Sequence, residues 1–269
     1  KHLLLLRKKN KRSLQLALAA LILLSACNAN SSKNKYSLAE KFLEDRKYEA
    51  AISEFQDVVD KEAFSDMGKT ALLKIAQIQH LYLGKAKDAE SNYELFLRRN
   101  KDEKLKAEVE KTLSQLSFAI FEDYHTAIDR YSLLIERYPN DPSLEQYYFN
   151  IARSYFLLSK FEEAKKAFED VRVRFPTGSL AKKALLEIAN AYAAKGNCKD
   201  AIKQYELVEK LNDKELTTMA KFGSALCYEE MGNLDVAYEI FGTIRNQYPT
   251  PRIVDLKMTK IKRRKILRR

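Results

Sequence analysis

The sequence predicts an all-α chain that folds as an α-solenoid of about six helical hairpins. Only 7 glycines and 5 prolines occur among 269 residues, too few for the many turns of a β-sandwich or a barrel. Apolar residues make up 46% of the chain and charged residues 32%, which is typical of a globular protein. An alanine also recurs at steps of 36 to 38 residues, and a fixed period of this length indicates a repeat array.

Each repeat contains an aromatic or apolar residue, two spacers, the alanine, three spacers and an aromatic residue. The copies, of which the second is the loosest, are Tyr48–Phe55, Ala86–Tyr93, Tyr124–Tyr131, Phe161–Phe168, Cys198–Tyr205 and Leu234–Phe241. Residues three and four apart share a helix face, so the alanine lets a neighbouring helix approach and the aromatic residue fills the groove one turn later. The pattern therefore predicts one helix of each hairpin.

Residues 1–26 are predicted to be a lipoprotein signal peptide. Six basic residues and no acidic residue occur before an apolar run from Leu14 to Leu24. The run is too short to cross about 30 Å of hydrocarbon as a helix. It ends in Leu24-Ser25-Ala26-Cys27, which resembles the lipobox of bacterial lipoproteins. The alternative is an ordinary secretory signal with an incidental cysteine.

The lipobox resemblance implies that Cys27 receives diacylglycerol and a fatty acid such as palmitate, and becomes the new N-terminus. Two or three acyl chains anchor a protein stably, at about 0.8 kcal/mol per buried CH₂ group. Asn28 follows the cysteine, which by resemblance to a known sorting rule implies the outer membrane, facing the periplasm. Residues 27–35 are small and polar, and they are predicted to be the lipidated cysteine and a flexible tether.

The hairpins are expected to fill residues 36–250. A second apolar helix pattern precedes each copy of the repeat, clearest in Ile151–Tyr155 and Ile188–Tyr192. Glycines mark the short turns within three hairpins, at positions 84, 196 and 232. Prolines end three of the second helices, because the residue before a proline disfavours the helical region; they are Pro139, Pro176 and Pro249.

This region resembles the tetratricopeptide repeat, whose hairpins stack into a right-handed superhelix because one hairpin alone cannot bury its apolar face. HEAT and Sel1 arrays are the alternatives. The segments Arg137–Pro142 and Arg174–Ala184 further resemble the lipoprotein of the outer-membrane β-barrel assembly machine (BamD-like). That resemblance implies partners in this machinery. The alternatives are a cell-division or peptidoglycan-associated adaptor resembling the coordinator CpoB, and an orphan lipoprotein adaptor.

The sequence contains no recognisable catalytic, metal or cofactor motif. His80 and His125 lack a further ligand at metal-binding spacing, and neither a phosphate-binding loop nor a nucleophile elbow occurs. Carboxylate pairs such as Glu162-Glu163 and Glu229-Glu230 lie among lysines and are expected to be solvated. We therefore predict no enzyme, no cofactor, no metal and no small-molecule substrate. Because the chain is predicted to be exported, we also expect no nucleic-acid partner.

Cys198 and Cys227 are expected at neighbouring ends of successive helices in the last two hairpins. In an oxidising compartment such a pair forms a disulfide. The alternative is a pair of buried small hydrophobic residues.

Partner binding is expected on the concave face, which the first helices of the hairpins line. The repeat register places six residues there: Phe149, Arg153, Phe156, Lys183, Leu186 and Asn190. Arginine and asparagine at such positions hydrogen-bond a peptide backbone or a carboxylate. The alternative is that all six are ordinary solvated helix residues.

The net charge of +11 is concentrated at the two ends of the chain. Residues 1–26 hold six basic and no acidic residues and residues 252–269 hold nine and one, which leaves 33 basic and 36 acidic residues between them. Residues 251–269 are predicted to form a basic capping helix through Ile253, Leu256 and Ile261, with a frayed tail from residue 262. The tail is expected either to be solvated or to dock on an acidic partner or on anionic headgroups.

Overall fold

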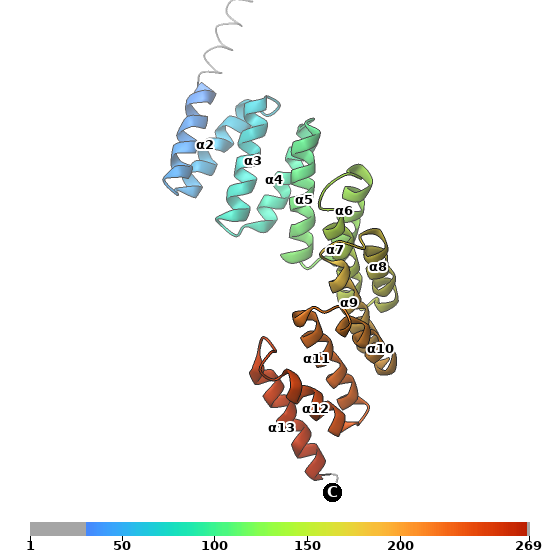
Figure 1. The fold of residues 1–269 in the computed structure, drawn as a ribbon. Coiled ribbons are helices and arrows are strands. Elements are labelled where there is room, and N and C mark those ends of the chain that lie inside the picture. The colour runs from blue at the N-terminus through green and yellow to red at the C-terminus, as the bar shows by residue number, and fades with distance from the viewer. Residues whose placement is uncertain (1–30, 268–269) are drawn as a thin grey trace, which may run out of the picture. The chain divides into compact units, whose positions relative to one another are not determined.

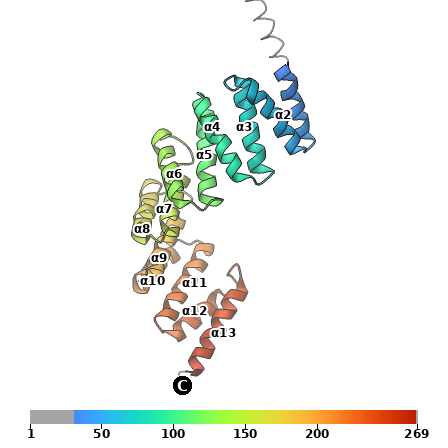
Figure 2. The same ribbon diagram turned by 180° about the vertical axis from the view of Figure 1, so that it is seen from behind.

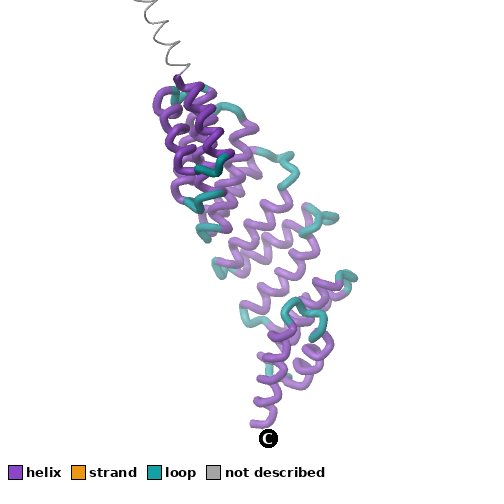
Figure 3. Tube along the Cα trace, turned by 90° about the vertical axis from the view of Figure 1, so that its left-hand side faces the viewer, coloured by secondary structure: helices purple, strands orange, loops and turns teal. Residues whose placement is uncertain are grey.

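A computed structural model describes residues 31–267, and these residues form helices and connecting turns without a strand (Figure 3). Residues 31–44 are helical. The later helices are α2 (Tyr48–Lys61), α3 (Asp66–Leu81), α4 (Ala86–Arg99), α5 (Glu103–Ala119), α6 (Tyr124–Arg137), α7 (Leu144–Leu157), α8 (Phe161–Arg174), α9 (Ala181–Ala194), α10 (Cys198–Glu209), α11 (Lys214–Glu230), α12 (Leu234–Ile244) and α13 (Pro251–Leu267). The all-α prediction is confirmed.

The chain divides into two compact units, one ending at Leu116 and the other beginning at Ser117. In the first unit, α3 packs between α2 and α4 (Figure 1). In the second unit, each helix from α6 to α13 packs against the next one along the chain, and α9 also contacts α11 (Figure 2). Each unit is therefore a row of antiparallel helices in which sequence neighbours are spatial neighbours.

The repeated alanines and aromatic residues form the cores of the hairpins. All six alanines, at positions 51, 89, 127, 164, 201 and 237, have no exposed surface. The aromatic residues four positions later are at most 3% exposed. Each copy of the pattern also begins at the first residue of a helix, which is α2, α4, α6, α8, α10 or α12. The repeat therefore predicted both the position and the buried face of every second helix.

Every hairpin turn contains a residue with a left-handed backbone two positions before its second helix. Glycine fills this position in three repeats, at Gly84, Gly196 and Gly232, with φ between 64° and 83°. In the other three repeats the residues are Arg46, Glu122 and Ser159, with φ between 51° and 59°. A side chain in this conformation costs about 1 kcal/mol or more. The glycine pattern revealed only half of these turns because the fold imposes the conformation on any residue at this position.

Two boundaries differ from those expected from the sequence. Residues 31–35, expected in the tether, are helical; Ser32 is buried, and Lys35 pairs with Glu54 at 3.1 Å. The rest of the expected tether and the signal peptide lie outside the described residues. Pro249 follows a turn instead of ending α12 directly, since that helix ends at Ile244, and Pro251 begins α13.

The C-terminal segment is one continuous helix through Leu267 and does not fray at residue 262. Val254 and Ile261 are fully buried, whereas Ile253 and Leu256 are exposed, so only one of the three expected capping contacts is made. Glu229 in α11 explains the rotation of α13 about its own axis. Its side chain is 7% exposed, contrary to the expected solvated carboxylate, and it is paired with basic residues of α13.

The turn positions give a test of the backbone strain. The substitution Ser159→Gly should raise the free energy of unfolding by up to about 1 kcal/mol, because glycine adopts a positive φ without a steric cost. The reverse change, Gly196→Ser, should lower it by a similar amount. Both values are measured by urea denaturation followed by circular dichroism.

Lys166→Gly is the matched control, since this exposed residue lies inside α8. Its replacement by glycine should lower the free energy of unfolding by about 1 kcal/mol. A loss of stability in Ser159→Gly equal to that of the control would contradict the strain at this turn.

Candidate protein-binding groove

A groove of about 640 Å³ runs along one face of the second unit. It is lined mainly by α7, α9 and α11, the first helices of the fourth, fifth and sixth hairpins. Its apolar lining includes Phe149, Leu186, Met219, Phe222 and Leu226. Charged side chains border this apolar surface: Arg153, Lys183, Glu187 and Glu215. An apolar floor with a charged border of both signs suits an amphipathic protein segment.

Five of the six residues expected at the partner surface line this groove: Phe149, Arg153, Lys183, Leu186 and Asn190. The sixth, Phe156, lies at the end of α7 and packs edge-on against Phe161, with ring centroids 5.5 Å apart. Phe161 is the first residue of α8, so the half-buried Phe156 side chain packs within its own hairpin and does not line the groove. The binding role of the five groove residues stays a prediction, although their common location is now established.

The sequence analysis missed the contribution of α11. Phe149, Leu186 and Phe222 each lie three positions before a fully buried alanine in their own helices, at 152, 189 and 225. Leu226 corresponds in the same way to Arg153 and Asn190. Extending the register by one repeat would therefore have found the residues of α11. Tyr248 has no such signal, because it comes from the irregular segment after α12 and reaches the groove by stacking on Phe222 at 4.4 Å.

A buried tyrosine fixes a polar side chain that lines the groove. The hydroxyl of Tyr205 donates to Oδ1 of Asn190 at 2.8 Å, and Nδ2 of Asn190 donates to Glu187 at 3.1 Å. Burial raises the pKa of Tyr205 above its usual value of 10, so the hydroxyl is neutral at physiological pH and serves as a donor. These two bonds hold the Asn190 amide in one orientation before any partner arrives.

Gly223 makes the position of Tyr205 possible. A Cβ atom on this glycine would lie 2.3 Å from the nearest ring carbon of Tyr205, far closer than a van der Waals contact. The glycine is inside α11, where it costs about 1 kcal/mol relative to alanine. The close approach of α11 to the tyrosine ring offsets that cost, and it brings the apolar residues of α11 into the groove.

Arginine and aromatic contacts shape the end of the groove near α7. The guanidinium of Arg153 lies 5.7 Å from the centroid of the Phe118 ring, within cation–π range. Phe149 packs edge-on against Phe168 in the core, with centroids 5.4 Å apart. Among the described residues, no carboxylate is paired with Arg153 or Lys183. Both cations are therefore available to an acidic group on a partner.

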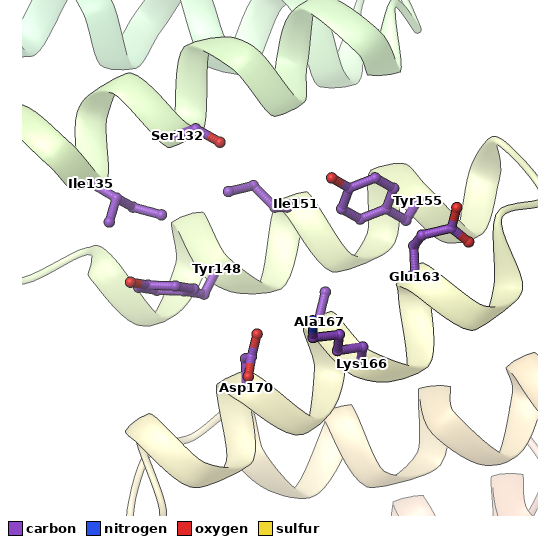
Figure 4. A pocket seen from close by; sticks show the side chains of 9 residues that line it. All are labelled: Ser132, Ile135, Tyr148, Ile151, Tyr155, Glu163, Lys166, Ala167 and Asp170. Atoms are coloured by element: carbon purple, nitrogen blue, oxygen red, sulfur yellow. The ribbon is translucent and has the colours of Figure 1, made fainter.

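A second, smaller hollow of about 440 Å³ lies between α6 and α8 (Figure 4). Tyr148, Ile151 and Tyr155 of α7 line it, and Ser132 and Ile135 come from α6. At 100° per residue these α7 positions lie on the side opposite to Phe149 and Arg153. Its charged residues, Glu163, Lys166 and Asp170, all come from α8. The hollow therefore belongs to the opposite surface of the array.

Cys198 and Cys227 are both buried and are free thiols in the same core cluster. The thiol of Cys198 donates to a carboxylate oxygen of Glu230 at 3.4 Å. Burial raises the pKa of both thiols, so they are protonated at neutral pH and react poorly as nucleophiles. Their shared cluster agrees with the expected proximity, and the oxidised alternative stays a prediction.

The two histidines contribute no metal site within the described residues, in which no group of three His, Cys, Asp or Glu side chains is arranged for a metal ion. His80 packs edge-on against Tyr93 with centroids 6.3 Å apart, and His125 is exposed. Over the same residues, no helix has the length and apolar character needed to span a bilayer.

Two segments of the second unit match models of protein families. Residues 149–215 and 219–251 match two family models, each described as a tetratricopeptide repeat. These two segments contain most of the groove. The search of curated proteins found no match to this sequence.

Solved structures with the same fold include a tetratricopeptide repeat protein from Parabacteroides merdae, with a TM-score of 0.58, 15% identity and 88% coverage of both chains. The C-terminal part of a repeat-containing protein from Cytophaga hutchinsonii has a TM-score of 0.55, 17% identity and coverage of 77% and 76%. PilW, a type IV pilus biogenesis factor, has a TM-score of 0.51, 15% identity and coverage of 86% and 97%. At these identities the likeness establishes the tetratricopeptide fold alone.

Gly223 provides a sharp test of the groove floor. Gly223→Ala should lower the free energy of unfolding by about 1–3 kcal/mol, because the new methyl group collides with the Tyr205 ring. This is opposite to the usual effect of replacing a helical glycine with alanine. The measurement is chemical denaturation of the two proteins side by side.

Gly242→Ala in α12 is the control, since its Cβ would meet only the terminal methyl of Met258 at 3.9 Å. We expect Gly242→Ala to raise the free energy of unfolding by up to about 1 kcal/mol. If both alanines stabilised the protein, the close packing of Gly223 and Tyr205 would be refuted.

The state of the cysteines is tested by counting thiols. In a Cys27→Ser chain purified without reductant, a thiol reagent should label neither cysteine in the native protein and both after unfolding in denaturant. Mass spectrometry gives the number of labels. Unfolded protein that takes up no label would establish the disulfide instead.

Proposed function

We propose that this protein is a lipid-anchored scaffold of the bacterial envelope, which binds a protein partner in the groove of its second unit. The groove carries the proposal: three successive first helices present equivalent apolar positions over one continuous floor. Tetratricopeptide folds act in general by presenting such surfaces to other proteins. Non-enzymatic binding is consistent with these contacts, since the groove residues described above are apolar, polar or charged without a nucleophile and base in contact.

The finer proposal is a BamD-like role in the assembly of outer-membrane β-barrel proteins. It rests on the lipobox-like segment ending at Cys27 and on the inter-repeat segments around Pro139 and Pro176. In this role Cys27 carries the lipid that holds the chain at the outer membrane, and the groove faces the periplasm. A barrel-assembly partner would place an apolar stripe on Leu186 and Phe222 and a carboxylate near Arg153 or Lys183.

The test is affinity capture from detergent-solubilised envelope, with the protein expressed in its own cells. Wild type should recover the barrel insertase with its periplasmic repeat domains. The variant Lys183→Glu/Leu186→Glu should recover at least about tenfold less insertase, because a buried apolar contact and a cation are both replaced by carboxylates. Val173→Glu in α8 is the control, since this side chain is 69% exposed and lies outside the groove.

Each other outcome separates the parts of the proposal. Recovery of division or wall-synthesis proteins in place of the insertase would assign the adaptor role, and pilus-assembly proteins would assign the role named for PilW. Equal recovery by wild type and by the groove variant would reject the groove as the binding surface. In the same cells, wild type should incorporate labelled palmitate and Cys27→Ser should not. Labelling of both would reject the lipid anchor at Cys27.

A further inference from the structure

One face of α13 holds this helix against the rest of the second unit. Val254 and Ile261, two turns apart, are fully buried against α12 and its neighbours. On the same side, Glu229 of α11 accepts hydrogen bonds from Lys257 at 3.4 Å and from Arg264 at 3.1 Å. This face is therefore fully used in internal packing and ion pairing.

The opposite face combines exposed aliphatic residues with unpaired arginines. At 100° per residue, this outer face of α13 consists of Arg252, Leu256, Arg263, Ile266 and Leu267. Leu256, Ile266 and Leu267 are 62%, 72% and 86% exposed. Within the described part of the chain, no carboxylate is paired with either arginine. The one acidic residue of α13, Asp255, is paired with Arg245.

This arrangement differs from an ordinary solvated helix face. Exposing apolar side chains to water is unfavourable, and the free-energy cost grows in proportion to the exposed apolar area. Leu256 and Leu267 are separated by about 16 Å along the helix axis, so the aliphatic residues cover about three turns. A helix that alternates leucine or isoleucine with arginine on one face typically lies flat in a membrane interface, with its aliphatic groups among the outer acyl carbons.

We propose that the outer face of α13 binds the surface of an anionic phospholipid bilayer. Arg252 and Arg263 pair with phosphate headgroups, and Leu256, Ile266 and Leu267 enter the boundary of the acyl region. Residues 27–251 are slightly acidic, with 33 basic and 36 acidic residues, so they are not attracted to such a surface. Charge complementarity therefore directs the C-terminal helix, and not the body of the protein, to the membrane.

A bilayer fits this face better than an acidic protein does. The exposed aliphatic residues project from a single helix at the end of the array, and a flat, deformable surface covers them without a matching cavity. The contact needs neither the groove nor a lipid on Cys27. It can therefore be tested, and can fail, separately from the proposed function.

Tryptophan fluorescence gives a local test, because the chain contains no tryptophan. Leu256→Trp is introduced into the full chain with Cys27→Ser. Vesicles of phosphatidylglycerol and phosphatidylcholine should shift its emission to shorter wavelength, whereas vesicles of phosphatidylcholine alone should not. Val173→Trp on α8 should show no shift with either. Leu267→Trp repeats the measurement should the first variant fold poorly by circular dichroism.

The arginines are tested in the Leu256→Trp background. Arg252→Glu/Arg263→Glu should raise the lipid concentration needed for half of the shift by at least about 30-fold, because each cation near an anionic surface contributes about 1 kcal/mol. Lys182→Glu/Lys199→Glu makes the same change in net charge at exposed positions of α9 and α10 and should leave the midpoint unchanged. No shift with anionic vesicles would overturn the proposal, as would equal effects of the two charge reversals. A shift caused by polyglutamate but not by vesicles would overturn it in favour of an acidic protein.

Discussion

The close contact between helices at a buried alanine is the constraint on which the rest of the structure depends. In each of the six repeats, an alanine without exposed surface lies one turn before an aromatic residue that is almost as buried. A larger side chain at the alanine would push the helices apart and open voids in a core that is otherwise close-packed. Because every repeat keeps this pair, the helices within each unit stack in one register, and equivalent positions of successive repeats line up on the same face.

The groove is a consequence of that register. The first helices α7, α9 and α11 also carry a fully buried alanine, and the positions three before and one after it line the groove and differ between repeats. In the second unit they are occupied by Phe149, Leu186 and Phe222, and by Arg153, Asn190 and Leu226. Gly223 and Tyr205 then bring α11 close enough for its apolar residues to join the same floor. Phe149 also packs against Phe168 in the core, so this position contributes both to the packing and to the lining of the groove.

The basic C-terminal helix illustrates how composition alone misleads. The chain carries a net charge of +11, yet the basic residues of α13 divide into two groups with different surroundings. Lys257 and Arg264 neutralise Glu229, a carboxylate whose side chain is only 7% exposed. Leaving such a buried charge without a partner would cost several kcal/mol, so the ion pairs fix the rotation of the helix. That rotation leaves Arg252 and Arg263 facing solvent.

The sequence by itself determined the fold class, the location and the buried face of all six second helices, and five of the residues that line the groove. It could do so because these features repeat with a fixed spacing, and spacing along a helix sets which face a residue occupies. Only the tertiary structure decided that Phe156 packs against Phe161, that Glu229 is buried, and that Ser159 adopts a left-handed backbone. These features depend on which helix or turn lies opposite a residue, and that neighbour is distant in the sequence or imposed by the fold.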